Sequence, residues 1–139
     1  MDQYTKTIAV KKNIAYVFKL WKEFENFPKF MKNITAVEKI DGISQWVMKR
    51  PLGKEVRWDA KTTTDILDKE IAWSSTGGDI KTSGQVLFTE IDNDTTQITV
   101  TLKYDVGGMK EIVRRLFANP EKQLEEDLRN FKEYTEGRK

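Results

Sequence analysis

The stretch "EVRWDAKTTT", residues 55–64, alternates between two kinds of side chain along most of its length. One set is apolar or small and comprises Val56, Trp58, Ala60 and Thr62; the other is charged and comprises Glu55, Arg57, Asp59 and Lys61. Successive side chains of a β-strand point to opposite faces of the sheet, so this stretch predicts a strand with one dry and one wet face. Trp58 is therefore expected to point into the core.

Runs with the same period of two flank this stretch on both sides and predict a meander of six consecutive strands. They are rich in Val, Ile, Thr and Trp and lie near residues 35–41, 43–50, 54–64, 69–76, 81–91 and 95–105. Turn sequences separate them: Asp41-Gly42 is typical of a two-residue hairpin, and Gly77-Gly78-Asp79 marks a later connection. Links this short make neighbouring strands antiparallel.

The face that carries Trp58 gathers large side chains from the other strands as well. By the same alternation, the inward side chains include Trp46, Met48, Trp73, Ser75, Phe88 and Tyr104. Small residues interrupt these inward rows at Ala60, Ser75 and Gly84. Small positions beside large rings leave room either for an interdigitating core or for a hollow, and the residue pattern is compatible with both.

The segment before the meander predicts one more strand and then a helix. Residues 4–10 place Tyr4, Ile8 and Val10 on one face, as in a strand with one buried side. Asn13 then provides an N-cap, and apolar residues follow at helical spacing up to Trp21. With the meander, this gives a sheet of about seven strands.

The next stretch, "FENFPKFMKNI" at residues 24–34, predicts a second short helix. Phe24, Phe27 and Met31 recur at three- and four-residue spacing and are expected to point inward. Phe30 falls off this stripe and is expected to lie partly outside. Lysines surround the aromatic residues, so the stretch also admits a transient contact with an anionic membrane surface.

The C-terminal part predicts the longest helix, which covers the inward face of the sheet. Its apolar positions recur at helical spacing and comprise Met109, Ile112, Val113, Leu116 and Phe117, followed by Leu124, Leu128 and Phe131. Asn119-Pro120 interrupts the series and is expected to mark a kink or a restart of the helix. The fold class is therefore α+β.

Length and composition narrow the function. The 139 residues are expected to form a single domain, residues 1–139, and the formal net charge of +2 argues against nucleic-acid binding. The chain has no cysteine and no histidine, which excludes Ser-His-Asp triads and zinc sites that use these ligands. No leader peptide or apolar span is visible, so we expect a cytoplasmic protein.

Four stretches carry a resemblance to a known family: "VFKLWKEFENFPKFMKNI" (17–34), "QWVMKRPLGKEVRWDAKTT" (45–63), "IAWSS" (71–75) and "NPEKQLEEDLRNFK" (119–132). Together with the predicted order of elements, they resemble the START-like (SRPBCC) superfamily. Within it they are similar to the bacterial polyketide cyclase/dehydrase-like family, which is related to coenzyme Q-binding and lipid-transport proteins. The resemblance implies the helix-grip fold, a curved antiparallel sheet wrapped around a long C-terminal helix.

The resemblance also implies a cavity between the sheet and the C-terminal helix that holds a hydrophobic small molecule, such as a lipid, a quinone or a polyketide. It places the cavity wall on the sheet, the C-terminal helix and the short helix that would act as a lid, which gives Phe24, Phe27, Met31, Trp46, Met48, Trp58, Trp73, Ser75, Phe88, Tyr104, Met109, Val113 and Phe117. We expect no cofactor and no metal, and the sequence leaves the oligomeric state open.

Two alternatives to a ligand carrier stay open. The first is an enzyme of the polyketide cyclase or dehydratase type, for which the inward polar candidates are Arg50, Thr62, Ser75 and Tyr104. No paired carboxylates, activated nucleophile or phosphate-binding loop is visible in the sequence. The second alternative is a protein-interaction module with a filled core.

Overall fold

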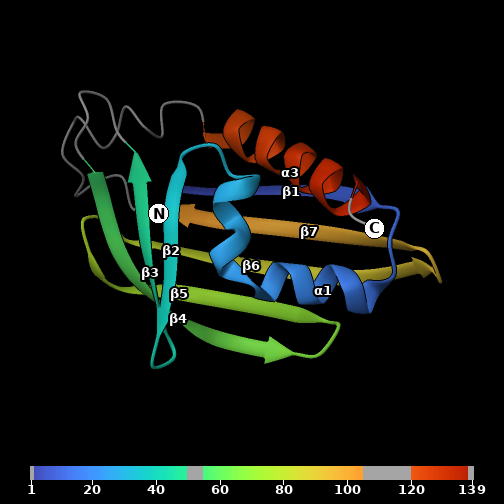
Figure 1. Cartoon of the computed structure of the whole chain (residues 1–139), viewed down its shortest axis with the longest axis horizontal. Helices are drawn as coiled ribbons and strands as arrows, with labels where there is room; N and C mark the ends of the chain where they lie inside the picture. The colour runs from blue at the N-terminus through green and yellow to red at the C-terminus, as the bar shows by residue number, and fades with distance from the viewer. Residues whose placement is uncertain (1, 50–54, 105–119, 138–139) are drawn as a thin grey trace.

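The computed structural model describes residues 2–49, 55–104 and 120–137 of the chain. A seven-stranded antiparallel sheet with the order β1-β7-β6-β5-β4-β3-β2 forms its body. In chain order the elements are β1 (Asp2–Val10), α1 (Ile14–Lys22), the 3₁₀ helix η1 (Phe24–Lys29), β2 (Ile34–Ile40), β3 (Ile43–Lys49), β4 (Glu55–Ile66), β5 (Glu70–Gly78), β6 (Thr82–Asp92), β7 (Thr95–Tyr104) and α3 (Pro120–Gly137). Figure 1 shows a strongly curved sheet, with α1, η1 and α3 on one side of it.

The predicted meander is confirmed, since all six of its strands are present and pair antiparallel with their sequence neighbours. β1 then pairs with β7, so that β1 and β2 form the two edges of the sheet. The Asp41-Gly42 hairpin is also confirmed. Both residues have positive φ, 51° and 81°, as the mirror-image turn of a two-residue hairpin requires.

The prediction that Gly77-Gly78 forms a turn is wrong, because both residues belong to β5. They pair with Asp59 and Trp58 of β4 after a register shift. Gly78 has a φ of 117°, and a Cβ atom there would lie 2.4 Å from the Cα of Trp58. The glycine thus permits a close approach of two strand backbones.

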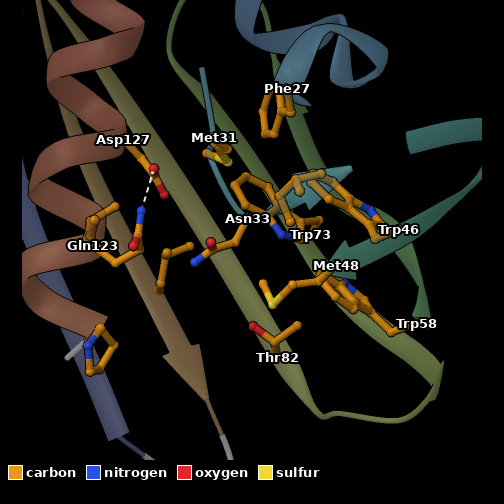
Figure 2. Close-up of a pocket in the computed structure, with 14 residues that line it drawn as sticks. Phe27, Met31, Asn33, Trp46, Met48, Trp58, Trp73, Thr82, Gln123 and Asp127 are labelled. Atoms are coloured by element: carbon orange, nitrogen blue, oxygen red, sulfur yellow. Dashed lines mark hydrogen bonds between the residues drawn. The ribbon is translucent and has the colours of Figure 1, made fainter. Parts of the chain in front are cut away.

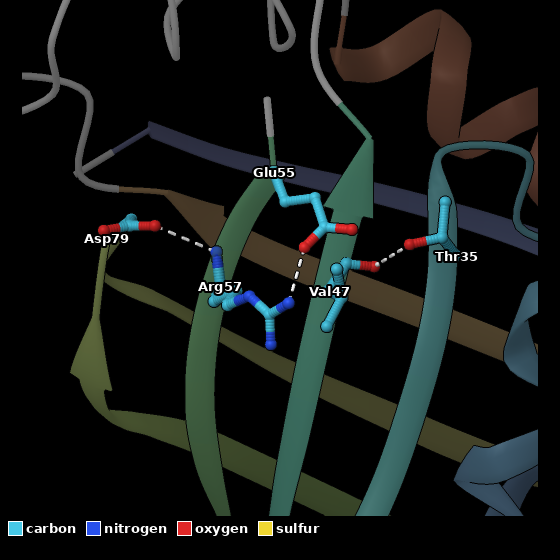
Figure 3. A network of polar contacts seen from close by, with 5 residues as sticks. All are labelled: Thr35, Val47, Glu55, Arg57 and Asp79. Carbon is cyan, nitrogen blue, oxygen red and sulfur yellow. Dashed lines mark hydrogen bonds and ion pairs between the residues drawn. The ribbon is translucent and has the colours of Figure 1, made fainter. Parts of the chain in front are cut away.

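Hydrogen bonds between Asp79, the residue after β5, and Arg57 of β4 fix the end of β5 to β4 (Figure 3). The Arg57 N–H donates to Oδ2 of Asp79 over 3.0 Å, and the Asp79 N–H donates to the Arg57 carbonyl over 2.8 Å. The Arg57 guanidinium also pairs with Glu55, 2.6 Å away on the same face. These contacts hold the segment of β4 that carries Trp58.

The N-terminal helices form as predicted, with one correction. Asn13 caps α1, since its Oδ1 accepts a hydrogen bond from the Ala15 N–H over 2.9 Å. Phe30 is not partly outside: it is 2% exposed and packs against Phe131 with ring centroids 5.0 Å apart. The reason is the period of η1. A 3₁₀ helix has about three residues per turn, so positions 24, 27 and 30 fall on one face.

Helix α3 packs along β1 and closes the open side of the sheet (Figure 1). The Lys6 ammonium of β1 lies 2.9 Å from the Glu121 carboxylate in its first turn. Phe131 on α3 is fully buried against Trp21 of α1, with ring centroids 4.8 Å apart. The structure describes α3 from Pro120 on. The predicted kink or restart at Asn119-Pro120 depends on residues 108–119, which lie outside the described residues.

Candidate functional site

A cavity of about 80 Å³ lies between the concave face of the sheet, the segment after η1 and α3 (Figure 2). Its lining comes from η1 and the segment that follows it, from strands β2 to β7 and from the first turns of α3. The described lining residues are Phe27, Met31, Asn33, Ile34, Trp46, Met48, Trp58, Trp73, Thr82, Leu102, Pro120, Gln123, Leu124 and Asp127.

Three indoles form the aromatic wall of this cavity. Trp46 and Trp58 face each other across β3 and β4 and stack nearly parallel, with centroids 5.9 Å apart and an interplanar angle of 8°. The Trp46 Nε1–H donates to Oγ of Ser44 over 2.8 Å, which fixes the orientation of this ring. Because strand alternation sends both side chains to the same face, the register of β3 and β4 places the two rings opposite each other.

The third indole, Trp73, occupies the space that Gly84 leaves on the neighbouring strand. A Cβ atom at Gly84 would lie 2.2 Å from Cζ2 of Trp73, so only glycine lets the ring lie flat against β6. The small residue at this position is therefore used for interdigitation and not for a hollow. Phe24 packs on the other side of the same ring, with centroids 5.7 Å apart.

The opposite side of the cavity is polar and belongs mainly to α3. The Gln123 Nε2–H donates to Oδ1 of Asp127 over 2.9 Å, one turn further along the helix (Figure 2). The Lys32 main-chain N–H also donates to the Asp127 carboxylate. Burial against apolar neighbours outweighs these hydrogen bonds and raises the pKa of Asp127 to about 6.

The same face of α3 holds the wall segment that follows η1. The Asn130 Nδ2–H donates to the Phe30 carbonyl over 3.2 Å, and Asp127 accepts from Lys32 two residues later. Met31 lies between these two attachment points and Asn33 directly follows the second, and both residues line the cavity. Side chains of α3 thus position the segment that closes the cavity.

Asp127 makes the stability of the fold depend on pH. Its pKa is raised in the folded state, so the stability that the group contributes is fully present below about pH 4 and is lost as the pH rises through about 6. We expect Asp127→Asn to raise the free energy of unfolding at about pH 8 by on the order of 1–2 kcal/mol. At about pH 5 the gain should shrink to less than half. Urea unfolding of both proteins at the two pH values checks this, and an equal effect at both would contradict it.

The structure brings six of the predicted ligand-binding residues together around the cavity: Phe27, Met31, Trp46, Met48, Trp58 and Trp73. Three others lie elsewhere. Phe24 is one layer behind the wall, Phe88 packs edge-on against Phe18 with centroids 5.1 Å apart, and Ser75 accepts a hydrogen bond from the Thr82 N–H. Met109, Val113 and Phe117, with the Tyr104 side chain and Arg50, lie outside the described residues.

The polar side of the cavity was not predicted from the sequence, although the position of Asp127 within an apolar helix stripe indicates that its side chain faces inward. It lies within the stripe Leu124, Leu128 and Phe131, at three- and four-residue spacing from its first and last members. A carboxylate inside an apolar helix stripe indicates either a buried partner or a site. Asn33 and Thr82 carry no such signal, because their positions depend on how the chain folds back.

Comparisons with known proteins agree with this architecture. A relative from Streptomyces lincolnensis, an uncharacterised 17.2 kDa protein from the melC2-rnhH intergenic region, is 28% identical over 139 residues, which cover 99% of this chain and 92% of the relative. A crystal structure from Deinococcus radiodurans has a TM-score of 0.77 at 29% identity and covers 99% of this chain and 100% of that one. The Zhui aromatase/cyclase of a Streptomyces species has a TM-score of 0.76 at 16% identity, with 97% of this chain and 93% of that chain covered, which shows a shared fold alone.

The sequence pattern of one family, described as polyketide cyclase / dehydrase and lipid transport, matches residues 10–129. The match includes every described lining residue of the cavity. Among the helices that the structure describes, none is both long and apolar enough to span a membrane.

Proposed function

Since the chain belongs to the polyketide cyclase/dehydrase and lipid transport family, we propose that it binds a hydrophobic small molecule with a flat, conjugated body in the cavity between the sheet and α3. The observation that carries this proposal is the indole wall. Trp46, Trp58 and Trp73 all line one cavity, although the strand pattern alone would also allow their rings to fill a solid core. Flat aromatic surfaces of this kind favour stacking with a planar guest.

The size of the cavity determines how a guest fits. A cavity of about 150 Å³ is known to accept benzene, and the present cavity of about 80 Å³ is smaller. Met31 and Met48 line it, and their unbranched side chains change rotamer at little cost. Binding of a bicyclic or larger guest is therefore expected to displace these two side chains and not the indoles.

The test of this proposal is a titration with three ligand classes: a short-chain phosphatidylcholine, the quinone menadione, and 2-naphthol as an aromatic stand-in for a polyketide. We expect saturable one-to-one binding of menadione or 2-naphthol, measured by calorimetry and by quenching of tryptophan fluorescence. Trp58→Phe removes half of the stacked pair and should weaken binding roughly two- to tenfold.

A matched control separates the cavity from the surface. Leu87 is 41% exposed on β6, and Leu87→Ser removes an exposed apolar side chain without touching the cavity lining. This variant should bind as the wild type does. Equal weakening in both variants, or no saturable binding of any of the three ligands, would contradict the proposal.

A second candidate function, acid–base catalysis on a polyketide-like substrate, is favoured by Asp127. Burial in an apolar cavity raises the pKa of this carboxyl to about 6, so that it exchanges protons near neutral pH. In this case Asp127→Asn should abolish turnover of an enolisable substrate while leaving binding of 2-naphthol measurable. A carrier without catalysis would show no turnover in the wild type.

A further inference from the structure

The described lining of the cavity contains an acidic side chain and no basic one. Lysine and arginine make up 24 of the 139 residues, yet none occurs among the described residues that line the cavity. Asp127 is the one ionisable side chain in this set. Within the part of the lining that the structure describes, a guest with a carboxylate would therefore meet an acidic group without a cation to neutralise it, in surroundings where burial strengthens charge repulsion.

Among the described residues, too few donors contact the Asp127 carboxylate to use its whole acceptor capacity. Two oxygens offer about four lone-pair sites. Two donors contact it, the Gln123 Nε2–H and the Lys32 main-chain N–H. In Figure 2 the carboxyl group lies at the α3 side of the cavity, across from the indoles. A hydroxyl at the far end of a stacked guest could thus donate to it.

We propose that the cavity selects neutral guests whose polar end donates a hydrogen bond, as a phenol or alcohol does, and that Asp127 is the residue that rejects carboxylates. This inference rests on the proposed function of the cavity and names its ligand class. It separates hydroxylated aromatic molecules from fatty acids and aromatic acids, which share the same apolar body.

Among the described residues, the charges on α3, on the segment after η1 and on the indole wall support this assignment. On α3, Gln123 is neutral and Glu126 adds negative charge, which raises the pKa of Asp127 further. From the segment after η1, Lys32 contributes its main-chain N–H, and its side chain is exposed. The sheet side contributes Trp46, Trp58 and Trp73, which carry no charge.

The experiment compares 2-naphthol with 2-naphthoate, which share one ring system, by calorimetry at about pH 7.5 and about pH 5. At the higher pH, where Asp127 is ionised, 2-naphthol should bind at least about tenfold more tightly than 2-naphthoate does. At the lower pH the carboxyl of Asp127 is mostly neutral, whereas 2-naphthoate stays largely ionised, so the difference should shrink several-fold.

Asp127→Asn is the decisive variant, because it removes the charge and keeps the shape. It should improve the binding of 2-naphthoate at about pH 7.5 roughly tenfold and abolish the pH dependence. Glu133→Gln makes the same change of charge at an exposed position of α3 and should leave both affinities unchanged. Calorimetry with 2-naphthoate on the three proteins measures this directly.

The outcomes separate the two proposals. If neither naphthalene binds, the proposed function fails and the ligand class fails with it. If 2-naphthol binds but the preference is the same in wild type and Asp127→Asn, the cavity binds as proposed and the role of Asp127 is overturned. If Glu133→Gln changes the preference as much as Asp127→Asn does, net charge and not the cavity carboxylate explains the selectivity, and the inference is likewise overturned.

Discussion

Replacing Phe131 with alanine is expected to lower the free energy of unfolding by about 3–5 kcal/mol. The ring is fully buried and joins α3 to both N-terminal helices, with centroid distances of 4.8 Å to Trp21 and 5.0 Å to Phe30. Its removal leaves a cavity among rings that cannot collapse far, because each is held by further aromatic neighbours. Urea unfolding at neutral pH measures the loss.

Glu133→Ala is the control for this experiment, since it lies on the same helix at an exposed position. It should change the unfolding free energy by less than about 0.5 kcal/mol. A loss below about 1 kcal/mol for Phe131→Ala would contradict the packing described for α3. The contact between α3 and η1 would then not be the one that holds the cavity wall.

Replacing Gly78 with alanine is expected to cost about 2–4 kcal/mol, from backbone strain and overlap together. The φ of 117° is one that side-chain-bearing residues rarely adopt, and the new Cβ would lie 2.4 Å from the Cα of Trp58. Relief of the overlap must move β4 or β5. Because β4 carries Trp58, the variant should also weaken the binding of 2-naphthol.

The adjacent glycine provides the matched control. A Cβ atom at Gly77 meets no atom within 4 Å, and its φ is not positive. Gly77→Ala should therefore change stability by less than about 1 kcal/mol and leave binding intact. Thermal and urea unfolding of the two variants side by side gives the comparison. Similar losses in both would show that the close approach of β5 to β4 is not what requires glycine.

The sheet could be predicted from the sequence because its signals are local. Alternation along residues 55–64 assigns Trp58 to the inner face, and the same alternation along residues 43–49 assigns Trp46 to that face, where the two residues pair across β3 and β4. Parity within each strand placed Trp46, Trp58 and Trp73 on the inner face, whereas the cavity that they line was implied only by the family resemblance. The family match over residues 10–129 confirms the resemblance to the polyketide cyclase/dehydrase family.

Other features depend on contacts that the sequence does not display. Phe30 was misplaced because the helical stripe assumed a period of 3.6, whereas η1 has the 3₁₀ period of about three. Gly78 was assigned to a turn because a glycine pair is typical of a turn. Glycine is required there because the backbone of the neighbouring strand β4 lies too close for a Cβ atom. Phe88 has the right parity yet lies too far along the sheet to reach the cavity, where it meets Phe18.

Binding of the guest against the indole wall is tested most directly by a titration with 2-naphthol. The titration follows the four indole N–H signals of the chain in a proton–nitrogen correlation spectrum. Trp46, Trp58 and Trp73 line the cavity, whereas Trp21 is fully buried in the core and lines no part of it. We expect the signals of the three wall indoles to shift together and saturate, and the change of the Trp21 signal to stay within a small fraction of theirs. Shifts confined to exposed backbone amides, with all four indole signals unmoved, would contradict it.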